Sequence, residues 1–333
     1  PAFETEFRRT TWQVEEGGSL IEVALDRGEI RGGGRAWPIS ELELELKSGE
    51  LGDLFALVDR LVRDLPFSLE PRSKAQRGYQ LAGALPLAPV KAVVPELDAA
   101  APASAAYGAI ARACMAQFEA NLPGFLLADD PDPEYVHQMR VAMRRLRAVT
   151  GLLRFMQRER PAWVGELRWL MGELSVARDW DVFVTETLPR VRAHIEQAAP
   201  VDALYEVAQG LRRQADARAR TALASARLVH LWLALERDLA ATVETPITTR
   251  DWARVALDRR YRQIRRLGSR LDELDPAERH ALRIAGKKLR YAAEFFVFLH
   301  PKAARRFIAT LAGLQDVLGV LNDVAVTANL LQE

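Results

Sequence analysis

The sequence predicts a mainly α-helical protein with a smaller N-terminal β part, an α+β chain overall. Alternating polar and apolar residues, separated by glycine-rich turns, fill the first 80 residues and predict strands. From residue 105 onward leucine, alanine, arginine and glutamate dominate, which favours helices. A long internal repeat in this helical part indicates two pseudo-symmetric units, each a helical hairpin or a four-helix bundle.

The β part is expected to span residues 1–85 as an antiparallel sheet. Its three strand segments read TEFRRTTWQVE, SLIEVALDRGEI and ISELELELKSG, and glycines 32–34 mark one of the turns. In ELELELK, the acids Glu41, Glu43 and Glu45 fall on one strand face and the leucines on the other. A short amphipathic helix, GDLFALVDRLVRDL, follows.

A linker is predicted at 86–103, where proline and alanine are frequent and helical periodicity is missing. The remaining region, 104–333, is the predicted helical domain. Within it VHQMRVAMRRLR matches RHALRIAGKKLR, and LSVARD matches LGVLND further along in the same order. Two matched pairs at nearly one offset indicate duplicated halves, at 136–182 and 279–326.

Each copy of the repeat carries a basic stripe, because a helix turns about 100° per residue. The first stripe contains His137, Arg140, Arg144 and Arg147, with Arg145 beside it. The second contains His280, Arg283, Lys287 and Arg290, with Lys288 beside it. Apolar residues lie opposite both stripes, so each helix is expected to present cations away from its own core. Together the stripes would line a shared cleft.

Such a cluster of cations repels itself unless anions or carboxylates neutralise it. A guanidinium group can form bidentate hydrogen bonds with phosphate oxygens, so a row of arginines is suited to a linear polyphosphate. The alternatives are a solvated helix face, or arginines paired with acids of the protein itself. A third basic stretch, DRRYRQIRRLGSR, places Arg259, Arg262 and Arg266 on one face as additional phosphate contacts, although a solvated face explains it equally well.

Composition excludes several classes of site. The net charge is only +1, but residues 1–70 hold 15 acidic and 8 basic side chains, so the remainder is basic. The single cysteine, Cys114, allows neither an intrachain disulfide nor a cysteine-based metal cluster. We find no phosphate-binding glycine loop, nucleophile elbow or zinc motif. With no signal peptide or membrane-spanning run in the sequence, a cytoplasmic protein without membrane contact is expected.

The segments HQMRVAMRRLR, ARDWDV, LRIAGKKLRY and LQDVLGVLND together resemble a CHAD domain, the conserved histidine α-helical family. The resemblance implies two four-helix bundles with a basic central channel, which binds long-chain inorganic polyphosphate without a cofactor. In bacteria it also implies association with polyphosphate granules. Carried over by position, both stripes become polyphosphate-binding residues. The second copy has lysine at 287 and 288 where the first has arginine. Lysine keeps the positive charge but cannot form the bidentate hydrogen bonds of a guanidinium group.

The β part is similar to the C-terminal half of a CYTH domain, the triphosphate tunnel metalloenzyme family, through IEVALDRGEI, ISELELELKSG and SKAQRGYQL. The resemblance implies that Glu43 and Glu45 would hold Mg²⁺ or Mn²⁺ in a complete tunnel, with Lys74 on the phosphates. The Glu-x-Glu-x-Lys signature of that family is missing, since Phe7 and Arg8 follow Glu6. The predicted sheet is therefore a partial tunnel, and we expect negligible hydrolysis and no catalytic residues in this chain.

Three functions follow, in order of support. The first is a binding module that captures polyphosphate and breaks no bond. The second is a metal-dependent inorganic triphosphatase or polyphosphatase, which requires a complete tunnel. The third, nucleic-acid binding, is weakest because neither stripe interleaves aromatic residues for base stacking.

Overall fold

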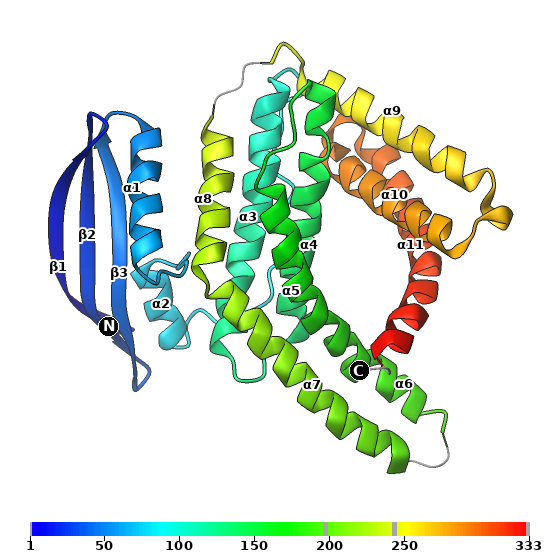
Figure 1. The fold of residues 1–333 in the computed structure, drawn as a ribbon, viewed down its shortest axis with the longest axis horizontal. Helices are drawn as coiled ribbons and strands as arrows, with labels where there is room; N and C mark the ends of the chain where they lie inside the picture. Colours follow the sequence, from blue (N-terminus) through cyan, green and yellow to red (C-terminus); the bar gives the residue numbers. More distant parts are fainter. Residues whose placement is uncertain (1, 196–198, 242–244, 331–333) are drawn as a thin grey trace. The chain divides into compact units, whose positions relative to one another are not determined.

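The computed structural model describes residues 2–195, 199–241 and 245–330. It is mainly helical, with one small antiparallel sheet at the N-terminus (Figure 1), so the predicted fold class is confirmed. The predicted linker contains neither helix nor strand from 86 to 101, and an isolated bridge pairs Pro102 with Thr248.

The sheet has three strands in the order β1-β2-β3, all antiparallel. Their bounds are β1 Phe3–Glu16, β2 Ser19–Gly32 and β3 Arg35–Ser48. Gly33 and Gly34 form the second hairpin turn with φ values of 56° and 75°. Glycine has no Cβ to oppose positive φ at two successive positions, which explains the glycine run at this turn.

Two helices cover opposite faces of the sheet. The first, α1 (Leu51–Asp64), packs its Leu57 on Ile21 and Val23, together with the leucines of β3. The second, α2 (Lys74–Leu81), packs Leu81 on Ile30 and Ile39. These two sets alternate along β2 and β3, so they point to opposite sides of the pleat. The predicted separation of leucines from glutamates on β3 is confirmed.

The helical region follows the linker. Its first helices are α3 Ala103–Leu127, α4 Pro133–Thr150, α5 Val164–Val182, α6 Leu188–Arg192, α7 Ala199–Leu223 and α8 Ala226–Ala240. The last are α9 Thr249–Gly268, α10 Pro276–Phe295 and α11 Pro301–Leu330. Short connecting helices are η1 Leu153–Met156, η2 Phe183–Thr187, η3 Leu271–Glu273 and η4 Val297–Leu299.

The repeat predicted from the sequence has the same local structure in both copies. In the first, the basic motif lies on α4 and the following motif on α5, and the two helices pack together. In the second, the basic motif lies on α10 and the following motif on α11, which again pack together. The side chains of the last motif, 318–323, lie outside the described residues. Because α10 also contacts α4, the two basic helices are neighbours.

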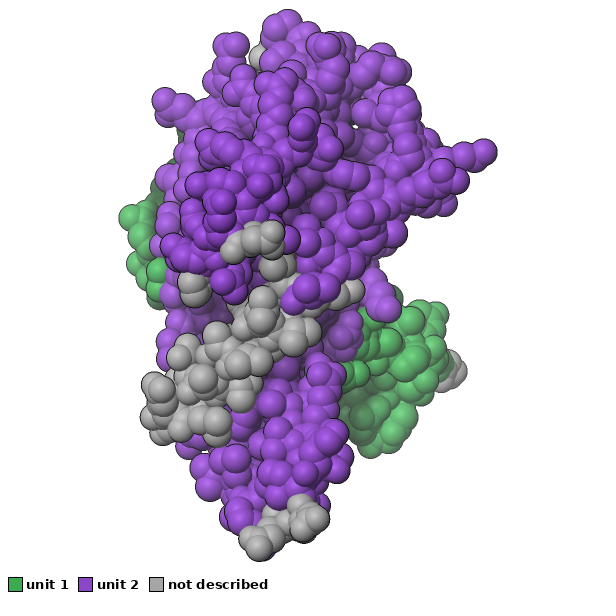
Figure 2. Space-filling model, turned by 90° about the vertical axis from the view of Figure 1, so that its right-hand side faces the viewer, with its two compact units in different colours: residues 1–89, 120–132, 220–241 green, residues 90–119, 133–219, 242–333 purple. Residues whose placement is uncertain are grey.

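The chain divides into two compact units, coloured separately in Figure 2. The first contains residues 1–89, 120–132 and 220–241, and the second contains 90–119, 133–219 and 242–333. Within the first unit α8 packs on α1, where Arg237 donates to Asp59 at 2.6 Å and lies over the ring of Phe55. In the part of the chain that is described, no helix is both long and apolar enough to cross a bilayer.

Candidate functional site

A cavity of 780 Å³ lies in the second unit, where α4, α5, α9 and α10 meet. Its lining is strongly basic: the described residues include eleven arginine and lysine side chains and one carboxylate, Asp179. The cations are Arg140, Arg144, Arg147, Arg154, Arg158, Arg160, Arg178, Arg260, Arg283, Lys287 and Lys288. His137, His280 and Tyr291 also contribute to the wall. Both predicted stripes therefore meet in one space.

Helix α4 contributes the first stripe because its opposite face is fixed in the core. Met139, Met143 and Leu146 are at most 1% exposed. The stripe arginine that follows each of them lies about 100° further around the helix and faces the cavity. Arg140 is held there by a hydrogen bond to the hydroxyl of Ser175 on α5, and that hydroxyl donates to the carbonyl of Met171 at 2.7 Å. The first stripe is therefore positioned by packing from one side and by α5 from another.

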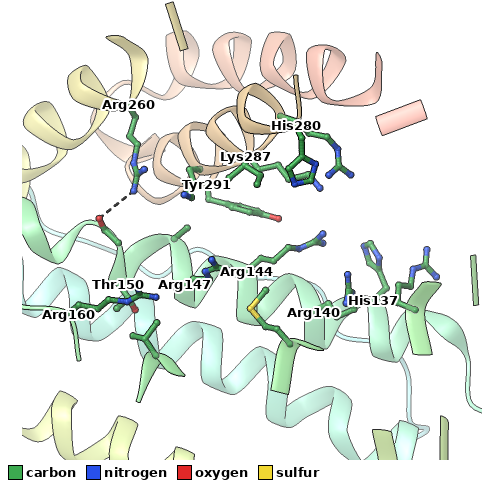
Figure 3. A pocket seen from close by; sticks show the side chains of 18 of the residues that line it. His137, Arg140, Arg144, Arg147, Thr150, Arg160, Arg260, His280, Lys287 and Tyr291 are labelled. Carbon is green, nitrogen blue, oxygen red and sulfur yellow. Dashed lines mark hydrogen bonds between the residues drawn. The ribbon is translucent and has the colours of Figure 1, made fainter. Parts of the chain in front are cut away.

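Helix α10 contributes the second stripe in the same way. Leu282 and Leu289 are buried on its back, while Lys287 and Tyr291 point toward α4 (Figure 3). The helix begins with a capping box, in which Asp275 accepts from the backbone of Glu278 and the Glu278 side chain accepts in return. Because the capping box fixes the residue at which α10 begins, it also fixes the direction in which the second stripe faces.

The cavity residues follow the length of α4 (Figure 3). His137 and His280 lie at one end, and Arg160 and Arg260 lie at the other. Arg144 and Lys287 lie between them, from α4 and α10 respectively. A linear polyanion placed along α4 would therefore meet cations from both repeats over most of its path.

Crowding of cations lowers their affinity for protons. Burial, followed by the charge of Arg144, lowers the pKa of Arg140 to about 10. Burial and the charges of Arg283 and Arg144 lower the pKa of Lys287 to about 8. A pKa falls this way when a cation lacks enough anionic neighbours and loses water. The cavity therefore concentrates positive charge in a partly buried space.

The same causes act at both ends of the cavity. Burial and the guanidinium of Arg178 lower the pKa of His137. Burial and the charge of Arg154 lower the pKa of Arg260 to about 10. Burial and the charge of Arg260 also lower the pKa of Lys288. An anion that enters the cavity would raise all these pKa values, so binding is expected to take up protons.

Two residues assigned to the stripes do not line the cavity. Arg145 is 4% exposed and donates to Glu294 at 2.5 Å, with its guanidinium over the ring of Phe295. Arg290 pairs with the same carboxylate at 3.3 Å. The sequence placed Arg290 in the second stripe and Arg145 beside the first. In the structure Arg145 joins α4 to α10 through Glu294, and Arg290 pairs with the same glutamate within α10.

The residues predicted from the third basic stretch lie outside the cavity. Arg259, Arg262 and Arg266 are exposed and absent from the cavity lining. Their neighbour Arg260 is 6% exposed, lines the cavity, and donates from Nη2 to the carbonyl of Gly151 at 3.4 Å. The packing of α9 therefore presents a different face to the cavity than the arginine spacing indicated.

Sequence analysis missed five cavity arginines, one of which is the Arg260 described above. Arg154, Arg158 and Arg160 lie in the segment between α4 and α5, where no helical period reveals a common face. Arg178 belongs to the ARDWD motif on α5, and the repeat there directed attention to the aspartates. The connecting segment adopts a left-handed conformation at Gln157 (φ 59°), the single positive φ outside glycine in the described ranges.

A second charged cluster lies on the sheet. Ligand atoms of Asp26, Glu41 and Glu43 lie within 4.8 Å of one another. Sequence analysis predicted Glu43 as a ligand, placed Glu41 on the same strand face without a metal role, and missed Asp26. Lys74 sits among them, 2.6 Å from Asp26 and 2.7 Å from Glu43, and also pairs with Glu41. Arg9 bonds Asp26 and Glu43 at 2.7 and 2.6 Å. The expected phosphate ligand Lys74 is instead bound to carboxylates.

These carboxylates have the hard oxygen donors that Mg²⁺ and Mn²⁺ prefer. However, the hydrogen bond from Arg9 lowers the pKa of Asp26 to about 2, and that from Lys74 lowers the pKa of Glu43. The lysine ammonium takes the central position that a metal would need, so this arrangement does not fit a divalent cation. Glu45, the other predicted metal ligand, is outside the cluster and bonds Lys47 at 2.8 Å.

Comparison with known proteins identifies the helical region. A family model described as CHAD domain matches residues 109–332. The chain belongs to the CHAD domain family. A crystal structure of the CHAD domain from the plant Ricinus communis is similar with a TM-score of 0.65 and 33% identity, covering 74% of this chain and 83% of that one. The resemblance predicted from the two histidine motifs is thereby confirmed.

The chain is also similar to a protein named inorganic triphosphatase from Haemophilus influenzae, with 53% identity over 83 residues. That match covers 24% of this chain and 23% of the relative, so the chain matches about a quarter of the relative's length.

Proposed function

We propose that the cavity of this CHAD protein binds inorganic polyphosphate and breaks no bond. The observation that carries the proposal is the lining of eleven cations and one carboxylate, contributed by both copies of the repeat. Charge alone would suit many anions, but the arrangement along α4 suits a linear one (Figure 3). Arginine provides paired donors for phosphate oxygens, and a row of them matches a chain with a charge on each phosphate.

The test is binding of long-chain polyphosphate to the 333-residue chain across a salt series. The cavity variant is Arg140→Ala/Arg144→Ala/Arg283→Ala/Lys287→Ala. A charge-matched control, Arg8→Ala/Arg27→Ala/Arg63→Ala/Arg213→Ala, removes four exposed arginines that do not line the cavity. Wild type and control should bind tightly and lose affinity steeply with salt, through counterion release. The cavity variant should bind at least about 100-fold more weakly, since each charged contact contributes about 1 kcal/mol or more.

If the folded cavity variant binds as tightly as the control, the stripes have a structural role and the proposal is wrong. Competition with single-stranded DNA of matched charge separates polyphosphate from nucleic acid. Equal affinity for the two polymers would contradict a polyphosphate site. We expect a preference for polyphosphate, because Tyr291 and Phe183 are the aromatic residues among the described cavity lining, too few to stack successive bases.

Binding of this kind would place the protein on polyphosphate granules. A fluorescent fusion of wild type should then gather on granules, and the cavity variant should stay diffuse. A granule signal from the cavity variant equal to wild type would exclude the cavity as the targeting element.

A second candidate function is metal-dependent hydrolysis of triphosphate, which the name of the bacterial relative favours. The carboxylate cluster on the sheet argues against it for this chain, because Lys74 and Arg9 already neutralise the acids. Phosphate release from tripolyphosphate with Mg²⁺ or Mn²⁺, abolished by a chelator and by Glu43→Gln, would establish the enzymatic function. If no phosphate is released under those conditions, hydrolysis is excluded for this chain and the binding function remains.

A further inference from the structure

Helix α9 carries an arginine surface outside the cavity. The helix contains seven arginines and two aspartates, an excess that the cavity does not use. Arg259, Arg262 and Arg266 are all exposed, and at about 100° per residue they fall within a stripe about 60° wide. We call these three residues the outer stripe.

Much of the outer stripe lacks a carboxylate partner. Arg262 pairs with Asp258 one turn earlier, but neither Arg259 nor Arg266 has an ion pair within the described ranges. Exposed guanidinium groups that remain unpaired are available to an external anion, and releasing their counterions favours binding.

The outer stripe begins at one end of the cavity. Two guanidinium groups lie close to the ring of Phe155, that of Arg154 at 4.6 Å and that of Arg259 at 5.5 Å from its centroid. Both arginines are exposed, but Arg154 lines the cavity and Arg259 lies on α9 outside the lining. Arg260, the next residue, is at the end of the cavity opposite the two histidines (Figure 3). Positive charge therefore continues from the cavity through Arg154 and Arg259 onto the surface of α9.

We infer that the outer stripe binds the part of a linear polyphosphate that extends beyond the cavity at its Arg260 end. The inference rests on the proposed function and adds a second site to it. A cavity of 780 Å³ holds only a short segment of a long polymer, so the emerging phosphates must lie on the protein surface or in solvent. Arg259 adjoins the cavity lining there, because it shares the ring of Phe155 with Arg154. The outer stripe thus gives the protein a preference for longer chains.

The inference is tested with two ligands, tripolyphosphate, which fits inside the cavity, and long-chain polyphosphate. The outer variant is Arg259→Gln/Arg262→Gln/Arg266→Gln, and the charge-matched control is Arg8→Gln/Arg27→Gln/Arg63→Gln. The outer variant should bind the long chain about tenfold more weakly than the control, and the slope of log affinity against log salt should decrease by about 2. Its affinity for tripolyphosphate should equal that of the control.

A second variant, Arg262→Glu/Arg266→Glu, keeps the arrangement around Phe155 intact and should weaken long-chain binding further. If the long-chain affinity of both α9 variants equals that of the control, the outer stripe is a solvated face and the inference is wrong. Equal losses for both ligands would also overturn it, because the effect would then lie in the cavity. The quadruple cavity variant distinguishes the two proposals: it should lose both ligands, and if it retains both, the proposed function itself fails.

Discussion

Lys287 is the cavity cation whose charge is most sensitive to pH near neutrality. Burial and the nearby charges of Arg283 and Arg144 bring its pKa to about 8 in the free protein. Bound phosphates would raise that pKa, so above pH 8 binding must take up a proton. We expect the affinity for polyphosphate to fall about tenfold between pH 7 and pH 9 at constant ionic strength, since only the protonated fraction is ready to bind.

Lys287→Arg is the matched variant for this prediction, because arginine keeps its charge throughout the range. Titration of the polymer's own end groups would affect both proteins equally. Isothermal titration calorimetry in buffers of different ionisation enthalpy measures the proton uptake directly. If the polyphosphate affinity of wild type depends on pH as little as that of Lys287→Arg, Lys287 stays charged in the free cavity and the prediction is wrong.

At the scale of helices, Glu294 joins the two basic elements. Its carboxylate accepts from the buried Arg145 of α4 at 2.5 Å and pairs with Arg290 of α10 at 3.3 Å. Glu294→Gln would leave Arg145 buried without a counter-ion. We expect a loss of about 2–4 kcal/mol in the free energy of unfolding, and weaker polyphosphate binding as the two stripes move relative to each other. Urea denaturation measures the first effect.

Asp202→Asn provides the comparison, because it breaks a bridge to Arg192 in which the arginine and aspartate side chains are 45% and 62% exposed. Solvent screens such a pair, so its loss should cost less than about 1 kcal/mol. Equal destabilisation by the two substitutions would show that the Glu294 bridge is no more than a surface contact.

Sequence periodicity predicted the stripes well, because the rotation between residues on one helix is fixed. Every member of the first stripe lines the cavity, and so do His280, Arg283 and Lys287 of the second. Arg145 was assigned to the cleft because it neighbours Arg144, yet one residue corresponds to about 100° of rotation. That rotation directs it into the contact with α10 instead.

Other parts of the site depend on tertiary structure and could not be derived from local pattern. On α9 the spacing of arginines identified a basic face, but the packing of the helix turns Arg260 inward and leaves that face outside. Arg154 and Arg160 reach the cavity from a connecting segment with no regular period. Similarly, Lys74 binds Asp26 and Glu43 only because α2 folds back over the sheet.

For the whole chain, a net charge of +1 conceals two different electrostatic conditions. The acids on the sheet of the first unit are neutralised by Lys74 and Arg9 within hydrogen-bonding distance. Among the described residues that line the cavity of the second unit there is one carboxylate, and burial together with one another's charge lowers the pKa values of Arg140 and Lys287. Folding without ligand therefore assembles like charges, which opposes stability in the second unit.

Salt should consequently act in opposite directions on the free and the bound protein. Without ligand, raising NaCl screens repulsion in the cavity, and we expect the melting temperature to increase by about 2–5 °C between low salt and about 0.5 M. With long-chain polyphosphate the protein should melt higher at low salt, and that gain should shrink as salt weakens binding. The two curves should converge at high salt when measured by differential scanning calorimetry.

The quadruple cavity variant tests the origin of this behaviour. With four cations removed it should melt higher than wild type at low salt without ligand, respond less to NaCl, and gain little from polyphosphate. The exposed-arginine control should follow wild type, because its substitutions leave the cavity charges in place. If the free cavity variant and free wild type instead respond to salt alike, repulsion in the cavity does not limit stability. In that case other contacts of the second unit neutralise its cations before any polymer binds.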